Sequence, residues 1–154
     1  MTQTRRSLLA LGALGAAGLA LSGCLDSGPA QLTVTARGEP GMNPGGDGAD
    51  RPVTLQIIQM SGTGAFDSAD VIALSQDPAG ALGAEFVKSD RLVLAPGATA
   101  DVTVPVDART TTIGVVGGFI DPAGKAVRAT VAAPSNDSGL TVAVGSGGIA
   151  LASA

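Results

Sequence analysis

The feature that most constrains the fold of this chain is an alternation of apolar residues with mostly polar ones in several short segments. Residues 31–36 read QLTVTA, residues 100–107 read ADVTVPVD, and residues 125–134 read KAVRATVAAP. Side chains two positions apart lie on the same face of a β-strand, so each segment can bury one face and expose the other. The pattern therefore predicts β-sheets that each turn an apolar face towards a core.

Turn residues separate these segments from one another and from further apolar segments. Residues 95–97 read APG, residues 121–124 read DPAG, and residues 134–137 read PSND, and these combinations favour tight turns. The apolar segments between the turns amount to seven or eight strands. We expect an all-β fold, an immunoglobulin-like β-sandwich with a short helical insertion, formed by residues 31–154 as one domain.

The helical insertion is expected at residues 66–76, which read FDSADVIALSQ and place apolar residues at helical spacing. Asp67 or Ser68 is expected to cap the start of this helix, because short polar side chains can accept hydrogen bonds from its first N–H groups. Asp77 and Pro78 are expected to end it.

The core is expected to contain few aromatic rings. The chain has no Trp and no Tyr, and aromatic residues make up 2% of it, so Val, Leu, Ile and Ala must fill the space between the sheets. Within residues 53–60, which read VTLQIIQM, the doublet of Ile57 and Ile58 breaks the alternation. The doublet indicates either a β-bulge or a strand that is buried on both faces.

The composition argues against most catalytic and metal chemistry. The chain has no His and a single Cys, Cys24, so it lacks an imidazole base and a CxxC pair. No Ser-x-x-Lys motif supplies a lysine base, and the spacing of Asp67 and Asp70 is typical of a helix N-terminus rather than a catalytic pair. The net charge of −4 provides no basic face for nucleic acid. We expect a non-enzymatic protein without a cofactor, which acts through its surfaces.

Residues 1–23 have the organisation of a lipoprotein signal peptide. Arg5 and Arg6 precede an apolar segment at residues 8–21 that is too short to span a bilayer as a helix. The segment ends in the sequence LSGC, which resembles the bacterial lipobox and places Cys24 at its modified position. The resemblance implies cleavage before Cys24 and acylation of its sulfur and amine, which would anchor the protein to a membrane. Residues 24–30 would then form a tether.

The export route and the destination follow from the residues around this segment. Residues 4–9, which read TRRSLL, resemble a twin-arginine export signal, but paired arginines such as Arg5 and Arg6 also occur in ordinary signal peptides, so both routes stay open. Leu25 follows Cys24. In the enterobacterial sorting pattern an Asp at this position retains a lipoprotein at the inner membrane, so we expect this chain at the periplasmic face of the outer membrane.

The most unusual surface is expected at residues 37–52, which read RGEPGMNPGGDGADRP. So many Gly and Pro residues predict a loop without helix or strand, and long loops in compact domains are usually functional or disordered. Met42 is expected to be an exposed apolar anchor for a partner. The alternative is a solvated loop without contacts. Asn43, Asp47 and Asp50 could coordinate calcium, but their spacing does not match an EF-hand, and we expect no bound metal.

Together these features resemble the TssJ family, the outer-membrane lipoproteins of type VI secretion systems. After the lipobox, the resemblance is carried by six segments in the same order. They are the strand LTVTA at residues 32–36, the loop rich in Gly, Pro and Asp at residues 37–52, RPVTLQIIQM at residues 51–60, AFDSADVIALSQDP at residues 65–78, ALGAEFVKSDRLVLAPG at residues 81–97, and IGVVGGFID at residues 113–121.

The resemblance implies a transthyretin-like sandwich that binds the periplasmic C-terminal domain of TssM, the large inner-membrane component. It also implies that the loop between the first two strands takes part in this contact. The residues that the loop would contribute here are Arg37, Gly38, Glu39, Pro40, Gly41, Met42, Asn43, Pro44, Asp47 and Asp50. The alternative function is that of a stand-alone lipid-anchored periplasmic binding or adhesion module with an immunoglobulin-like sandwich.

Overall fold

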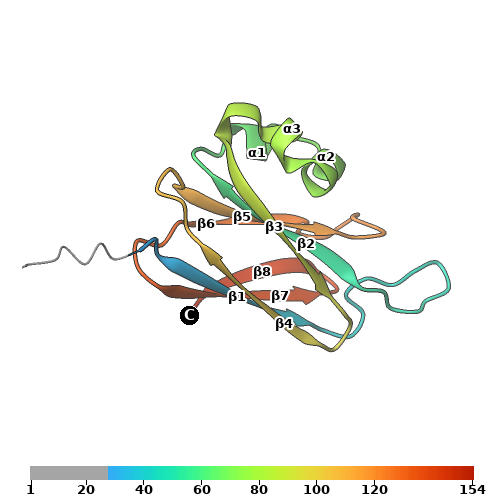
Figure 1. Cartoon of the computed structure of the whole chain (residues 1–154). Coiled ribbons are helices and arrows are strands. Elements are labelled where there is room, and N and C mark those ends of the chain that lie inside the picture. The colour runs from blue at the N-terminus through green and yellow to red at the C-terminus, as the bar shows by residue number, and fades with distance from the viewer. Residues whose placement is uncertain (1–27) are drawn as a thin grey trace, which may run out of the picture.

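Two four-stranded sheets pack face to face to form a β-sandwich (Figure 1). The structure is a computed structural model that describes residues 28–154, so the predicted signal peptide, with Arg5 and Arg6, and the predicted lipidation site, Cys24, lie outside the described residues. The first sheet has the order β4-β1-β7-β8, and the second has the order β3-β2-β5-β6. The prediction of an all-β sandwich is confirmed.

The strands follow the alternating segments of the sequence. The first sheet contains β1 (Gln31–Gly38), β4 (Thr99–Pro105), β7 (Ser138–Gly145) and β8 (Gly148–Ser153). The second sheet contains β2 (Val53–Met60), β3 (Phe86–Leu94), β5 (Thr112–Gly118) and β6 (Arg128–Ala132). Strands β1 and β7 are parallel, and the other neighbours are antiparallel.

The core between the sheets is aliphatic, as the composition predicts. Alternate residues of both sheets meet there, because each strand turns every second side chain inwards. Fully buried members include Val34, Leu55, Val115 and Val142. Burial of such a side chain stabilises the fold by about 1.5–3 kcal/mol relative to exposure, so this cluster is the main stabilising element of the sandwich.

Strand β2 is buried on both faces. Ile57 belongs to the core between the sheets, whereas Ile58 belongs to a second cluster on the outer face of the β3-β2-β5-β6 sheet. Neither side chain is exposed to solvent. Of the two interpretations of the doublet, burial on both faces is therefore confirmed. The irregularity in the pairing with β3 lies two positions later, between Gln59 and Met60.

Short helices cover this outer face (Figure 1). They are α1 (Gly64–Ser68), α2 (Val71–Gln76) and α3 (Pro78–Leu82), followed by the 3-10 turn η1 (Gly83–Glu85). The prediction of one helix over residues 66–76 is wrong, because the backbone is extended at Ala69. Asp70 then starts α2, and its carboxylate accepts hydrogen bonds from the N–H groups of Ile72 and Ala73 at 2.9 and 3.2 Å. Asp67 and Ser68 lie inside α1 and do not cap it.

Polar side chains of the sheet hold the helix ends. The guanidinium of Arg128 donates to the carbonyl oxygens of Phe66 and Ala69 at 2.7 and 2.8 Å, where a positive charge also interacts favourably with the helix C-terminus. The amide of Gln56 donates to the carbonyl of Ser75 at 2.8 Å. The helices are therefore fixed to the sheet at their ends as well as through the apolar cluster beneath them.

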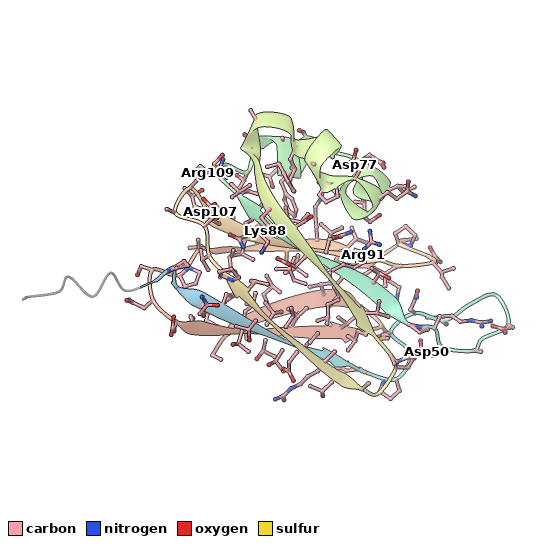
Figure 2. All side chains as sticks on the ribbon, in the orientation of Figure 1. Asp50, Asp77, Lys88, Arg91, Asp107 and Arg109 are labelled. Carbon is pink, nitrogen blue, oxygen red and sulfur yellow. The ribbon has the colours of Figure 1, made fainter. Side chains whose placement is uncertain are left out.

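The sandwich has two distinct ends. Because Gly38 pairs with Val144 and Thr54 pairs with Gly118, four connections meet at the end of the sandwich where β1 finishes, which we call the distal end. These connections are residues 39–52, 95–98, 119–127 and 146–147. The start of β1 lies at the opposite end, the N-terminal end. Figure 2 shows Asp50 at the distal end, and Asp107 and Arg109 at the N-terminal end.

Within residues 28–154, no helix has the length and the apolar character needed to span a membrane.

Candidate functional site

The loop between β1 and β2 comprises residues 39–52 and projects from the distal end (Figure 1). The sequence predicted that the loop starts at Arg37, and this boundary is wrong. Arg37 pairs with Thr99 on one side, and Gly38 pairs with Val144 on the other, so both residues extend β1. Partners on both sides of β1 satisfy the backbone groups of these residues, which outweighs the low strand propensity of Gly.

Met42 is part of the core, and the prediction that it is an exposed anchor is wrong. Its side chain is fully buried among the residues between the sheets, including Val53, Leu94 and Val144. The left-handed backbone at Gly41, with φ of +80°, turns the chain back over the open end of the sandwich. Met42 therefore closes the apolar core at the distal end.

Gly38 makes room for this arrangement. A Cβ at position 38 would lie 2.6 Å from the carbonyl oxygen of Ala95 and 3.0 Å from the sulfur of Met42. Both distances are shorter than van der Waals contact, so glycine is needed where the loop leaves β1.

Asn43 joins the loop to the rest of the distal end. The residue is 2% exposed, its Nδ2 donates to the carbonyl of Pro52 at 3.1 Å, and its Oδ1 accepts from the N–H of Ile120 at 2.9 Å. A buried amide costs little when both of its polar atoms have partners. Asn43 therefore fixes the base of the loop against the β5–β6 connection.

Asp50 orders the first half of the loop. Its carboxylate accepts from the N–H groups of Gly41 and Asn43, both at 2.7 Å. The N–H group of Asn43 is the largest influence that holds the pKa of Asp50 below its ordinary value of 3.8. Desolvation is the next largest and opposes it, and the N–H groups of Gly41, Met42 and Arg51 lower the pKa further. The carboxylate is therefore ionised at neutral pH and binds these N–H groups as charge-assisted acceptors.

The three residues considered for calcium do not converge. Asp47 forms a salt bridge with Arg51 at 2.7 Å, Asp50 binds backbone N–H groups, and both polar atoms of the Asn43 amide are engaged. Among residues 28–154, no three or more Cys, Asp or Glu side chains gather where they could hold a metal ion. The oxygen atoms of the loop thus serve to shape the loop itself.

Lys125 is a functional candidate that the sequence did not reveal. Its ammonium group donates to the carbonyl of Met42 at 3.3 Å and to that of Ser146 at 2.8 Å, and it lies 5.4 Å from the ring centroid of Phe119. One side chain of the β5–β6 connection therefore holds the β1–β2 loop and the β7–β8 turn together. A lone Lys in a turn carries no sequence signal for such a role.

Only the tip of the loop, residues 44–49, projects freely from this base. Pro44 and Asp50 form an isolated antiparallel bridge, and within the tip the N–H of Gly45 donates to the carbonyl of Ala49 at 2.8 Å. Between the tip and the β5–β6 connection lies a hollow of about 470 Å³, lined by residues that include Pro44, Ile120 and Asp121. The distal end is thus an ordered surface with a projecting tip and an adjacent hollow.

The predicted loop residues fall into three groups by exposure. Arg37, Glu39, Pro40, Gly41, Pro44 and Asp47 are exposed, Gly38 and Asp50 are half-buried, and Met42 and Asn43 are buried. A partner could contact the first group directly, whereas the buried pair can act only by shaping the loop.

A protein-family model matches residues 30–147 of this chain, and its description is "Type VI secretion lipoprotein, VasD, EvfM, TssJ, VC_A0113". The chain belongs to this family. The match covers the sandwich from its first strand to the β7–β8 turn and includes the whole distal end. Family membership identifies the chain as a structural lipoprotein of a type VI secretion system. No curated protein matches the chain.

Solved structures of type VI secretion proteins have the same fold. TssJ1 from Pseudomonas aeruginosa superposes with a TM-score of 0.75 at 24% identity, covering 82% of this chain and 97% of its own. The Lip protein of Serratia marcescens, a membrane-bound component of the system, gives 0.73 at 18% identity, covering 80% and 98%. A chain in the structure of the TssM C-terminal domain from EAEC gives 0.66 at 23% identity, covering 79% and 97%.

Proposed function

We propose that this lipoprotein is anchored at the periplasmic face of the outer membrane by acyl chains on Cys24. We further propose that its distal end binds the periplasmic C-terminal domain of TssM. The protein would thereby join the outer membrane to the inner-membrane component of the secretion complex. The observation that carries this proposal is that the start of β1 and the β1–β2 loop lie at opposite ends of one rigid sandwich (Figure 1).

The length of the tether supports this orientation. Cys24 precedes the first described residue, Gly28, by four positions, and four residues span at most about 14 Å. The N-terminal end of the sandwich would therefore lie close to the membrane. Strand β1, with eight residues, then carries the chain about 26 Å further along the sandwich to the β1–β2 loop. The loop is thus held away from the bilayer, where a periplasmic partner can reach it.

The order of the loop supports binding as well. Met42, Asn43 and Asp50 shape the base of the loop through contacts within the chain, so the loop does not need a partner to become ordered. A surface that is organised before binding loses less conformational entropy on association. The likeness to a chain in the structure of a TssM C-terminal domain is consistent with this partner.

Shortening the tip of the loop is expected to weaken binding to TssM without unfolding the sandwich. Residues 45–49 would be replaced by the turn-forming pair Asn-Gly, which keeps Pro44 and Asp50 and removes the residues that project beyond their bridge. We expect the affinity for the periplasmic domain of TssM, measured by isothermal titration calorimetry, to fall about tenfold or more. A deletion that included Met42 or Asn43 would instead disturb the core.

The matched control changes two exposed residues at the N-terminal end, Ser135 and Asn136, to glycine. We expect this variant to bind TssM as the wild type does. Equal affinity of the shortened and wild-type proteins would rule out the tip as a contact. The alternative function, a stand-alone binding or adhesion module, predicts that the wild type does not bind TssM at all.

Replacing Cys24 by serine is expected to release the protein from the membrane, because serine cannot accept the lipid on sulfur. In the native host, we expect wild-type protein in the outer-membrane fraction and the Cys24→Ser variant either uncut or in the soluble periplasmic fraction. Ser27→Ala, three residues further along the tether, is the control and should fractionate as the wild type does. An outer-membrane location for Cys24→Ser would contradict lipid anchoring at this residue.

A further inference from the structure

We propose that the β5–β6 connection forms a second wall of the TssM-binding site, with Ile120 and Asp121 as its contact residues. The hollow between this connection and the tip of the β1–β2 loop would receive an apolar side chain of the partner that has a lysine or arginine beside it. This inference rests on the proposed function and adds to it a second contact segment and the chemistry of the bound group.

The first argument is that the two segments form one unit. The N–H of Ile120 donates to the buried Oδ1 of Asn43, and the ammonium of Lys125 donates to the carbonyl of Met42. The β1–β2 loop is thus fixed to the β5–β6 connection, 77 and 83 positions further along the chain. A partner that contacts the tip of the loop therefore meets a neighbouring wall whose position is already set.

The second argument is the exposure of Ile120. Three large hydrophobic side chains are prominently exposed among residues 28–154, namely Ile72 at 63%, Val93 at 60% and Ile120 at 57%. Ile72 lies on α2 and Val93 on β3, and neither lines the hollow. Ile120 lines the hollow, together with Pro44 from the β1–β2 loop. An exposed apolar side chain at the edge of a hollow next to a binding loop is the arrangement expected of a binding anchor.

The size of the hollow sets the kind of group that it can take. Its volume of about 470 Å³ is in the range of ligand-binding clefts and can receive an apolar side chain with part of its backbone. Ile120, from the β5–β6 connection, and Pro44, from the tip of the β1–β2 loop, contribute apolar surface to its lining. A projecting segment of the partner with one apolar side chain would bury that side chain between them.

The charged residues that line the hollow indicate which kind of partner residue lies beside this apolar side chain. Asp121 is exposed, and its carboxylate accepts one hydrogen bond, from the N–H of Ala123 at 3.0 Å. Lys125, the basic residue among those that line the hollow, is engaged by two carbonyl oxygens and lies over the Phe119 ring. The carboxylate of Asp121 therefore has acceptor positions left for a partner, whereas two of the three donors of Lys125 are taken within the chain, which favours a partner segment with a lysine or arginine next to the apolar side chain.

The position of the hollow also fits a periplasmic partner. The β5–β6 connection lies at the distal end, because Gly118 at the end of β5 pairs with Thr54 at the start of β2. The proposed anchor at Cys24 leads into the opposite end, within a tether of at most about 14 Å. The hollow is therefore directed away from the membrane together with the β1–β2 loop.

The test compares two isoleucines with nearly equal exposure. Ile120→Ser and Ile72→Ser would each be titrated with the periplasmic domain of TssM, and thermal melting would confirm that both are folded. We expect Ile120→Ser to lower the affinity about tenfold or more, and Ile72→Ser to change it less than about twofold.

A second variant tests the charge at the hollow. Asp121→Asn keeps an oxygen acceptor for the N–H of Ala123 and removes the charge. We expect it to lower the affinity about threefold in low salt, with a smaller effect in high salt, whereas Asp67→Asn on α1 should have no effect.

The outcomes separate this inference from the proposed function. If the shortened tip abolishes binding but Ile120→Ser binds like Ile72→Ser, the second wall is overturned and the proposed function stands. If Asp121→Asn binds like Asp67→Asn at both salt concentrations, the flanking basic residue of the partner is overturned. If wild-type protein does not bind the TssM domain, the proposed function fails and this inference fails with it.

Discussion

Replacing Met42 by alanine is expected to lower the free energy of unfolding of the sandwich by about 2–5 kcal/mol, the usual cost of removing a buried methionine side chain. Met42 is fully buried and packs with Leu94 and Val53, so truncation leaves a cavity at the distal end of the core. Urea denaturation followed by circular dichroism measures this change. The sequence around Met42 has the composition of an exposed loop. A large loss of unfolding free energy in Met42→Ala would therefore show directly that this side chain is buried.

Met42→Leu is the matched control, because leucine has a similar volume and keeps the site filled. We expect it to cost less than about 1.5 kcal/mol. If Met42 were instead an exposed contact for a partner, Met42→Ala would leave the denaturation midpoint unchanged and would weaken only binding. An unchanged midpoint would therefore contradict the buried position.

Replacing Gly148 by alanine is expected to cost about 2–5 kcal/mol. Gly148 has a φ of +99°, a left-handed conformation that costs other residues about 1–2 kcal/mol. In addition, a Cβ at this position would clash with the backbone N, C and O atoms of Ala126. Backbone atoms cannot move aside as a flexible side chain can, so a further overpacking cost of about 1–3 kcal/mol is expected. Thermal unfolding followed by circular dichroism measures the loss.

Gly124→Ala separates these two causes. Gly124 also has a positive φ, +70°, but a Cβ there would meet nothing within 4 Å. We expect Gly124→Ala to cost only the conformational part, about 1–2 kcal/mol. Equal destabilisation by the two substitutions would show that the close approach of Gly148 to Ala126 does not matter.

This close approach connects the two sheets at the distal end. Ala126 donates its N–H to the carbonyl of Gly147 at 2.8 Å, and its own carbonyl accepts from the N–H of Ile149 at 2.8 Å. The β7–β8 turn is thereby joined to the β5–β6 connection, which Asn43 and Lys125 join to the β1–β2 loop. Three connections of the distal end therefore support one another, which is the physical basis for the proposal that this surface is ordered before a partner binds.

Much of the fold could be predicted from the sequence, because its signals are local. The alternation of Leu32, Val34 and Ala36 depends only on residues two apart, and it places these side chains on one face wherever the strand finally lies. The turns with Pro, Gly and Asp act through the backbone preferences of a few consecutive residues.

The helical insertion is predicted from local signals too, but its interruption at Ala69 is not. Asp67, Ser68 and Asp70 all satisfy the local rules for a cap, and the carbonyl groups of Phe66 and Ala69 find their partner in Arg128, on a strand about 60 positions away.

The sequence by itself determined the strand segments, their buried faces, the aliphatic character of the core and the resemblance to the TssJ family. Only the tertiary structure decided which sheet each strand joins, that Met42 lies in the core, and that Asn43 and Lys125 attach the β1–β2 loop to its neighbours. The reason is the separation along the chain. The periodicity of a strand depends on residues two positions apart, whereas the burial of Met42 and the partners of Asn43 depend on segments up to about a hundred positions away, which come together only when the two sheets close on each other.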